Sequence, residues 1–267
     1  MTDGSLLGGL CGFIFDLDGT IYRGNELLPG ARSFIAMLRR RGIPHIFLTN
    51  NSTTPRDAVA RRLVAMGVEA SPEEVLTSSD ATAAALASEM PGIRVFVIGE
   101  EGVRTALTSR GFELTEDYRR ADAVVVGMDR RLTYARLSEA ALAVRRGALL
   151  IATNTDRTLP TEIGLIPGAG SLVAALEVAT DVRARVIGKP EPGVFRQAVA
   201  CMGTAPACTA SVGDRPETDI TGGQRAGLRT IAVLSGAGTA AAFAALDPPP
   251  DWVFADLAAL EAAYAKE

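Results

Sequence analysis

The sequence predicts an α/β protein: a three-layer core with a parallel sheet, carrying a second, smaller α/β unit as an insertion. Two observations predict this class. Short apolar runs alternate with helical stretches along the 267 residues, which is typical of strand–helix–strand units with right-handed crossovers. This rhythm restarts near residue 81 and resumes near residue 184. The predicted core is therefore 1–80 with 184–267, and the predicted insertion is 81–183.

The first strand–helix–strand unit lies close to the N-terminus. Residues 13–15 form an apolar run that predicts a fully buried strand. Residues 31–41 follow as an amphipathic helix, with apolar side chains on one face and arginines largely on the other. Residues 44–48 then predict the next strand. Two strands joined by a helix favour a parallel pair.

The remaining elements are predicted from the same patterns. Helices are expected at 56–66, 192–202 and 240–245, and after a third strand an alanine-rich helix runs to residue 89. Strands are expected at 75–79, 93–98, 122–127, 148–152, 209–214, 229–234 and 252–254.

Charge and hydropathy exclude several classes of function. The net charge of −4 gives no electrostatic case for binding nucleic acid or an anionic membrane. No uncharged apolar run reaches the roughly 18 residues that a membrane span needs. Residues 1–10 lack the basic start and apolar stretch of a signal peptide. We expect a cytoplasmic protein that has neither nucleic acid nor membrane as a partner.

The three cysteines show neither a paired framework nor metal-ligand spacing. We expect each to be a small buried apolar residue in a reducing compartment. They are Cys11, Cys201 and Cys208.

Two carboxylates close the first strand. Asp16 and Asp18 are two residues apart, so they point to the same side if the strand geometry persists. Neighbouring acids repel each other, and a metal ion or proton transfer is the usual reason for such a pair. An Asp-Gly turn at Asp18–Gly19 is the competing interpretation, but it leaves Asp16 unexplained.

Polar groups also follow other predicted strands. In an open parallel sheet, ligands bind beyond the carboxyl ends of the strands. Three carboxylates gathered there would suit Mg²⁺, which prefers carboxylates, a carbonyl, waters and a phosphate oxygen. Lysine and threonine would then hold the phosphate, and backbone N–H groups near Gly19 and Asn50 could form an anion nest. The groups concerned are Asp16 and Asp18, Thr49 and Asn50, Asp214, and Lys189.

Four motifs in order resemble those of the haloacid dehalogenase-like hydrolase superfamily. They are Asp-x-Asp-Gly-Thr at 16–20, Thr-Asn-Asn at 49–51, Gly-Lys-Pro at 188–190 and Gly-Asp-Arg-x-x-Thr-Asp at 213–219. The Thr-Asn-Asn form and the large insertion resemble the NagD-type branch, whose core is Rossmann-like. That branch contains phosphatases for nucleotides, phosphoglycolate, glycerol phosphate, pyridoxal phosphate and 4-nitrophenyl phosphate. One such motif is weak evidence, and four in order are strong.

The resemblance implies a phosphatase mechanism. Asp16 would attack phosphorus to give an aspartyl phosphate, and Asp18 would carry the proton to the leaving alcohol and from the hydrolytic water. Mg²⁺ would be held by the Asp16 carboxylate, the Asp18 backbone carbonyl and Asp214. Dehalogenases and the ATP-driven pumps of the superfamily lack an acid at position 18, which favours ester hydrolysis. A receiver-like signalling module and a non-catalytic metabolite-binding protein are the alternatives.

Two residues keep open alternatives. Asp219 would orient the waters of the metal, or it could answer a helix dipole at a helix N-terminus. Thr49 would bind phosphate, or it could cap the next helix, although Asn51 is nearer for that task.

The insertion resembles the cap of this family, which covers the site. Its segment 154–160 resembles the family's specificity loop, and Asp156, Arg157 and Leu159 are candidates for contacting the leaving group. Arg157 could favour an acidic leaving group, or it could be a solvated loop cation. Leu159 stands where pyridoxal phosphatases carry histidine, which disfavours that substrate. Caps of this branch often mediate dimers, so a homodimer is allowed.

Overall fold

The computed structural model describes residues 7–161 and 163–267, and these form two compact units. The first comprises the described residues up to Thr49, then Val59–Leu76 and Lys189–Glu267. The second comprises Asn50–Ala58 and Thr77–Gly188. The inserted unit is thus a few residues longer at each end than the sequence pattern indicates, and it includes a short segment that the pattern places in the core.

The first unit is built on a six-stranded sheet with the order β15-β14-β13-β1-β4-β5. From β1 the chain adds strands on one side, and after the insertion it adds strands on the other side. The order therefore reverses between β1 and β13, which is where open α/β sheets bind ligands. The strands are β1 (Gly12–Phe15), β4 (His45–Thr49), β5 (Val75–Thr77), β13 (Thr209–Gly213), β14 (Arg229–Val233) and β15 (Trp252–Phe254).

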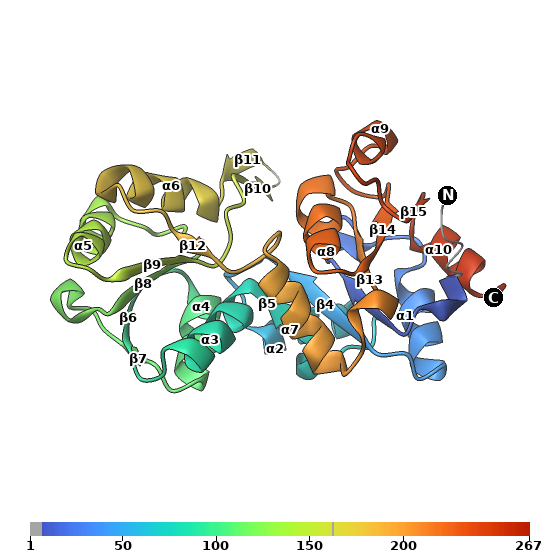
Figure 1. The fold of residues 1–267 in the computed structure, drawn as a ribbon, viewed down its shortest axis with the longest axis horizontal. Helices are drawn as coiled ribbons and strands as arrows, with labels where there is room; N and C mark the ends of the chain where they lie inside the picture. The colour runs from blue at the N-terminus through green and yellow to red at the C-terminus, as the bar shows by residue number, and fades with distance from the viewer. Residues whose placement is uncertain (1–6, 162) are drawn as a thin grey trace. The chain divides into compact units, whose positions relative to one another are not determined.

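Helices cover both faces of this sheet, as Figure 1 shows, and make it a three-layer core. Phe13 and Phe15 point to one face, where Phe13 packs edge-on against Phe34 and Tyr264, each with ring centroids 5.4 Å apart. The opposite face is covered by α7 and α8, which contact β1 and β14 respectively. The helices of this unit are α1 (Ala31–Arg40), most of α2 (Arg56–Ala65), α7 (Pro192–Met202), α8 (Thr221–Arg225), α9 (Ala240–Ala244) and α10 (Leu257–Tyr264).

The second unit repeats the architecture with a five-stranded sheet of order β12-β9-β8-β6-β7, paired in parallel throughout. Helices α3 and α4 contact each other, as do α5 and α6, and Figure 1 shows the two pairs on opposite faces of the sheet. The strands are β6 (Arg94–Ile98), β7 (Glu113–Leu114), β8 (Ala123–Val126), β9 (Leu149–Ala152) and β12 (Arg185–Val186). The helices are α3 (Ser78–Glu89), α4 (Glu101–Ser109), α5 (Tyr134–Arg145) and α6 (Ala169–Thr180).

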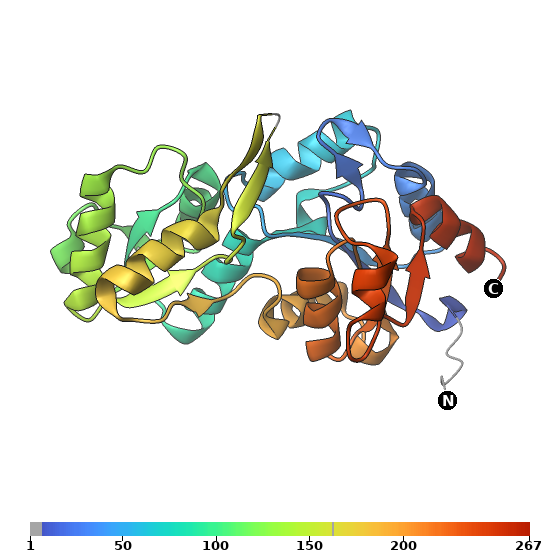
Figure 2. The same cartoon turned by 90° about the horizontal axis from the view of Figure 1, so that it is seen from above.

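The α/β class, the parallel core sheet and the additional α/β unit are confirmed, and local expectations differ in two places. The strand expected at 75–79 ends at Thr77, whose hydroxyl accepts from the Asp80 N–H at 3.1 Å and so caps α3. The segment 154–160, expected as a loop, runs into a hairpin of β10 (Thr158–Thr161) and β11 (Gly164–Pro167). Figure 2 shows this hairpin projecting beyond the five-stranded sheet. A second short antiparallel hairpin is formed by β2 (Tyr22–Arg23) and β3 (Glu26–Leu27). Such short strands have too little apolar periodicity to be predicted from the sequence.

The cysteine prediction is wrong. Cys11 and Cys208 form a disulfide with their Cα atoms 5.2 Å apart, and Cys201 is exposed rather than buried. The cause is the register of β1 and β13, in which Gly12 pairs with Thr209, so the residues before them are neighbours. A separation of 197 residues hides this proximity in the sequence.

None of the described helices is long and apolar enough to cross a bilayer.

Candidate active site

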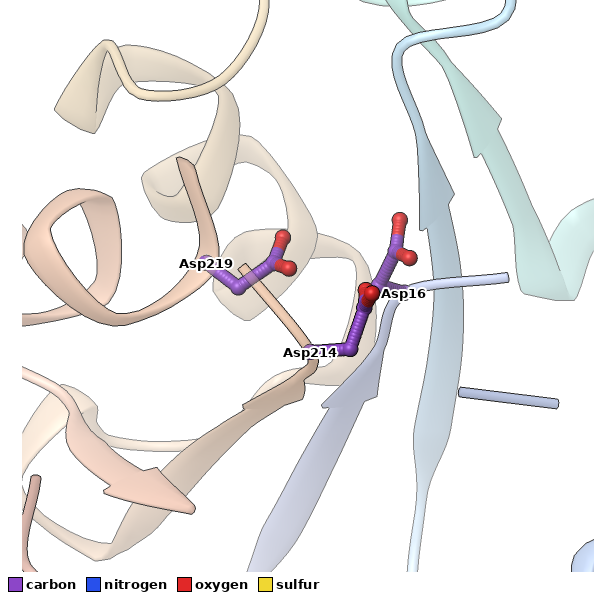
Figure 3. A group of neighbouring side chains, drawn as sticks. All are labelled: Asp16, Asp214 and Asp219. Atoms are coloured by element: carbon purple, nitrogen blue, oxygen red, sulfur yellow. The ribbon is translucent and has the colours of Figure 1, made fainter. Parts of the chain in front are cut away.

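The carboxyl ends of β1 and β13 bring three acids together. Asp16 follows β1, and its N–H donates to the Val212 carbonyl of β13 at 2.9 Å. Asp214 follows β13, and Asp219 lies in the turn of helix η5 (Pro216–Ile220). One carboxylate oxygen from each of the three lies within 4.8 Å of the others. Figure 3 shows the carboxylates turned toward a common region beyond the strand ends.

Lys189 is the cation of this cluster. Its Nζ lies 2.5 Å from Asp16 Oδ1 and 2.7 Å from Asp219 Oδ1, and its side chain is only 4% exposed. Burial alone would lower the pKa of Lys189, but the two carboxylates outweigh burial and raise it above the usual range. Lys189 is therefore a permanent positive charge next to Asp16.

Asp219 holds Lys189 in place through their ion pair. Besides the lysine, it accepts from the Arg215 N–H at 3.0 Å, and its side chain is 2% exposed. The sequence left open whether this acid orients a metal or answers a helix dipole. In the structure it fixes the lysine and the turn that follows Asp214.

Asp214 carries an oxygen that is suited to a metal. Its Oδ2 accepts from the Ala237 N–H at 2.6 Å, whereas its Oδ1 is buried and has no hydrogen-bond partner among the described residues. Burial, and then the nearby Asp219, raise the pKa of Asp214. An unsatisfied buried carboxylate oxygen is costly. A hard cation such as Mg²⁺ would remove this cost, so the residues present fit the ion that the sequence implies.

Asp16 and Asp18 are separated by their surroundings. The pKa of Asp16 is raised, chiefly by burial. The positive charge of Lys189 lowers this pKa, whereas the negative charges of Asp219 and Asp214 raise it further. Asp18 lies outside the three-carboxylate cluster of the described residues, and the residue is exposed. Its pKa is also raised, chiefly because protein atoms displace part of its hydration. A solvent-accessible acid with a raised pKa suits proton transfer.

Gly19 has a different role from the predicted anion nest. Its N–H donates to the Tyr22 carbonyl at 2.8 Å, so this donor already has an acceptor. Its φ is +93°, and a Cβ there would lie 2.5 Å from Asp214 Oδ2. Gly19 therefore allows the backbone to approach Asp214.

The other predicted site residues fall in two places. Thr49 is buried at the end of β4, beside β1, at the same edge of the sheet as Asp16. Asn50 belongs to the second unit, where its Nδ2 donates to Asp156 Oδ1 at 3.1 Å. Arg157 is exposed, and Leu159 lies on β10.

Two contributions to the site were not predicted. The Ala237 N–H, which orients Asp214, comes from the loop after β14, where only Gly236 and Gly238 are conspicuous; a Cβ at Gly236 would lie 1.9 Å from Asp214 Oδ2. Arg62 lies 4.4 Å from the centroid of the Tyr22 ring. Its positive charge offsets part of the increase that burial causes in the pKa of Asp18. No local signal in the sequence points to this arginine.

Comparisons with known proteins identify the relatives of this chain. A family model described as haloacid dehalogenase-like hydrolase matches residues 13–113, and a second model, HAD-hydrolase-like, matches residues 186–260. The acid sugar phosphatase of Staphylococcus aureus (strain USA300) is 41% identical over 245 residues, which cover 92% of this chain and 94% of that protein.

Solved structures are similar along nearly the whole chain. A double mutant of a thermostable NPPase from Geobacillus stearothermophilus is 42% identical, with a TM-score of 0.88 over 94% of this chain and 97% of its own. The 4-nitrophenylphosphatase of Thermotoga maritima is 34% identical, with a TM-score of 0.91 over 97% and 98%. A glycerol phosphate phosphatase from Mycobacterium tuberculosis, in complex with magnesium, is 38% identical, with a TM-score of 0.89 over 96% and 78%.

Identity above 40% over nine-tenths of both chains, together with the four motifs at the edge of the sheet, decides the family. The chain is an enzyme of the haloacid dehalogenase-like hydrolase family and belongs to its NagD-type branch.

Proposed function

We propose that the protein is a Mg²⁺-dependent phosphatase that hydrolyses small phosphomonoesters through an aspartyl phosphate on Asp16. The observation that carries the proposal is the group of Asp16, Lys189, Asp214 and Asp219 at the point where the strand order reverses, in which Asp16 is partly buried and the others are buried. It combines a nucleophile, a fixed cation and an unsatisfied oxygen for a metal.

The chemistry divides between the two acids of the first motif. An Asp16 oxygen attacks phosphorus, and the P–O bond to the alcohol breaks. The Asp18 carboxyl group gives its proton to the departing oxygen and later takes a proton from the water that attacks the acyl phosphate. That second attack releases inorganic phosphate and restores Asp16. Lys189 offsets the negative charge that nucleophile and phosphoryl group bring together.

The metal would be held by Asp16, Asp214 and the backbone carbonyl of Asp18. When bound, Mg²⁺ supplies Lewis-acid stabilisation of the phosphoryl oxygens. Thr49, at the end of β4, would hydrogen-bond the phosphoryl group.

The second unit is proposed to act as a cap that excludes water and selects the leaving group. Arg157 and Leu159 are proposed to contact that group. Sugar phosphates, glycerol phosphate, phosphoglycolate, nucleoside monophosphates and 4-nitrophenyl phosphate are the candidate substrates.

Steady-state hydrolysis of 4-nitrophenyl phosphate with Mg²⁺ tests the class of reaction. We expect turnover that EDTA abolishes and Mg²⁺ restores, with a transient phosphoprotein detected by mass spectrometry after acid quenching. A panel of phosphate esters ranked by kcat/KM then identifies the substrate class. Stable phosphorylation by acetyl phosphate without turnover would instead indicate a receiver-like module, and binding without either reaction would indicate a metabolite-binding protein.

The cytoplasmic location and the homodimer remain predictions. A disulfide is uncommon in reducing compartments, so the Cys11–Cys208 bond tests the location directly. Alkylation of free thiols in intact cells before lysis, followed by mass spectrometry, reports whether these two cysteines are bonded where the protein resides. Light scattering of the purified protein reports its oligomeric state.

A further inference from the structure

Residues 50–54, which we call the crossing segment, lie across the carboxyl ends of the second unit's sheet. After β8, the Met128 N–H donates to Ser52 Oγ at 2.9 Å. In α4, the Gly102 N–H donates to the Thr53 carbonyl at 2.9 Å. This segment carries Asn50 and Asn51 of the second motif, whereas Thr49 belongs to the first unit, so the motif is divided between the two units.

Asn50 is the residue of the crossing segment that reaches the selector loop, defined as residues 154–160. Its Nδ2 lies 3.1 Å and 3.3 Å from the two carboxylate oxygens of Asp156. Its carbonyl accepts from Asn154 Nδ2 at 2.8 Å. The Asp156 N–H in turn donates to Asn154 Oδ1 at 3.1 Å. Side chain and backbone of Asn50 thus hold the loop at two points.

Two other places where the chain passes between the units, at Ser78 and Gly188, also lie at Asn50. The Ser78 hydroxyl, where the chain re-enters the second unit, donates to the Asn50 carbonyl at 2.9 Å. Where the chain leaves the unit, the Gly188 N–H donates to the Thr153 carbonyl at 2.8 Å. A Cβ at Gly188 would lie 2.7 Å from Asn50 Oδ1, so glycine is required for this approach.

We propose that Asn50 is a positioning residue that anchors the selector loop through Asp156, and that this anchor, not a bond from the Asn50 side chain to phosphate, is its contribution to catalysis. Asp156 then accepts the hydrogen bond from Asn50 and does not contact the leaving group. Arg157 and Leu159 are the residues of the loop that would contact the leaving group. The inference rests on the proposed phosphatase function. Its distinctive consequence is that Asn50 affects how the leaving group is recognised while the phosphate affinity of the core stays unchanged.

A reciprocal exchange of the two side chains tests the proposal. Asn50→Asp sets two carboxylates against each other, and Asp156→Asn in the same chain restores one amide and one carboxylate with donor and acceptor exchanged. We expect Asn50→Asp to lower kcat/KM by about 10- to 100-fold, the order expected for loss of a charge-assisted hydrogen bond. The double variant should recover to within about threefold of wild type. The loss should lie mainly in KM, and it should vary across esters with different leaving groups.

The inhibition constant of inorganic phosphate separates the two roles of Asn50. An anchor leaves that constant within about twofold of wild type in both variants, since the contacts to phosphate are untouched. A side chain that binds phosphate directly would raise the constant in Asn50→Asp, and the double variant would not recover. That result, or an uncorrected loss of kcat/KM in the double variant, would overturn the proposal.

Amide hydrogen exchange gives a readout that needs no activity. Asn50→Asp should speed exchange in the selector loop, and the double variant should slow it again. Asp117→Asn is the matched control, because it alters an acid of the same unit that accepts from the Arg119 N–H at 3.1 Å, and it should leave the loop unchanged. An inactive wild type would refute the proposed function, whereas unchanged loop exchange in Asn50→Asp would refute the anchor alone.

Discussion

The two parallel sheets use their carboxyl edges for different purposes. At the edge of the six-stranded sheet lie three buried or partly buried acids and a buried lysine, and one carboxylate oxygen lacks a partner among the described residues. At the edge of the five-stranded sheet, residues that come after the strands donate hydrogen bonds to the crossing segment. The same architecture thus provides two kinds of edge. One carries the proposed catalytic residues and is called the reactive edge, and the other is bonded to the crossing segment and is called the anchoring edge.

Glycines allow close backbone contacts at the anchoring edge. A Cβ at Gly127, after β8, would lie 2.8 Å from Ser52 Oγ, and a Cβ at Gly102 would lie 2.5 Å from the Ser52 carbonyl. Gly127 follows β8 directly, as Asp16 follows β1 and Asp214 follows β13, whereas Gly102 lies in α4. A parallel sheet therefore offers a site, and the residues after its strands decide whether it holds a ligand or a chain segment.

The largest expected effect compares one acid from each edge. Asp16→Asn should lower kcat/KM by about 10⁴-fold or more, because the proposed nucleophile is lost. Asp129→Asn, which changes an acid after β8 in the second sheet, should stay within about twofold of wild type. Stopped assays with 4-nitrophenyl phosphate measure both, and circular dichroism verifies folding. Near-normal turnover of Asp16→Asn would remove the chemical distinction between the edges.

The second effect concerns Asp18, the proposed proton carrier of the reactive edge. Asp18→Asn should lower kcat by about 10²- to 10⁴-fold for an alkyl ester such as glycerol phosphate. The loss should be smaller for 4-nitrophenyl phosphate, whose leaving group departs readily as an anion. The ratio of the two losses is the measurement. Equal losses for both esters would show that Asp18 does not protonate the leaving group.

The third effect links metal, pH and stability. Asp16 and Asp214 have raised pKa values in the fold without a bound cation. The folded state therefore binds more protons than the unfolded state, and this proton binding stabilises the fold at low pH. The stabilisation is lost as the pH rises from about 4, the ordinary pKa of Asp, through the raised values. Mg²⁺ should restore stability at neutral pH by about 2.7 kcal/mol at a hundredfold excess over its Kd.

Thermal unfolding with Mg²⁺ and with EDTA at pH 5 and 7.5 measures this effect. The gain from Mg²⁺ should be larger at pH 7.5, and Asp214→Asn should lose most of it. A gain that is independent of pH and of Asp214 would place the ion elsewhere.

The smallest expected effect on catalysis comes from the opposite edge of the first sheet. The Cys11–Cys208 disulfide joins the amino ends of β1 and β13, and the second unit contains no cysteine. Cys208→Ser should lower the free energy of unfolding by about 2–4 kcal/mol, with kcat within about twofold of wild type. Urea unfolding measures it, and Cys201→Ser is the control because Cys201 is free and exposed. Equal stability of the two variants would argue against the bond.

Local patterns predicted the class, most helices and strands, and the strand ends that carry Asp16, Thr49 and Asp214, because burial and periodicity are properties of short segments. The four motifs placed Lys189 near them. What the sequence could not provide depends on contacts between distant segments. The Cys11–Cys208 pair follows from strand register, and the bond from Asn50 to Asp156 spans 106 positions. The structure brings Asp16, Lys189, Asp214 and Asp219 together. The chemical roles of all the predicted site residues remain predictions.

The interrupted course of the first unit also bears on how the protein forms during synthesis. Most of the second unit is continuous, from Thr77 to Gly188, and its strands are complete once residue 186 has been made. The central strand β1 must wait for β13, which begins at Thr209, before it gains its second neighbour. Because domains tend to fold as units during translation and long-range pairing is slow, the inserted unit should fold first on the ribosome. The reactive edge, which needs both β1 and β13, would then be assembled last.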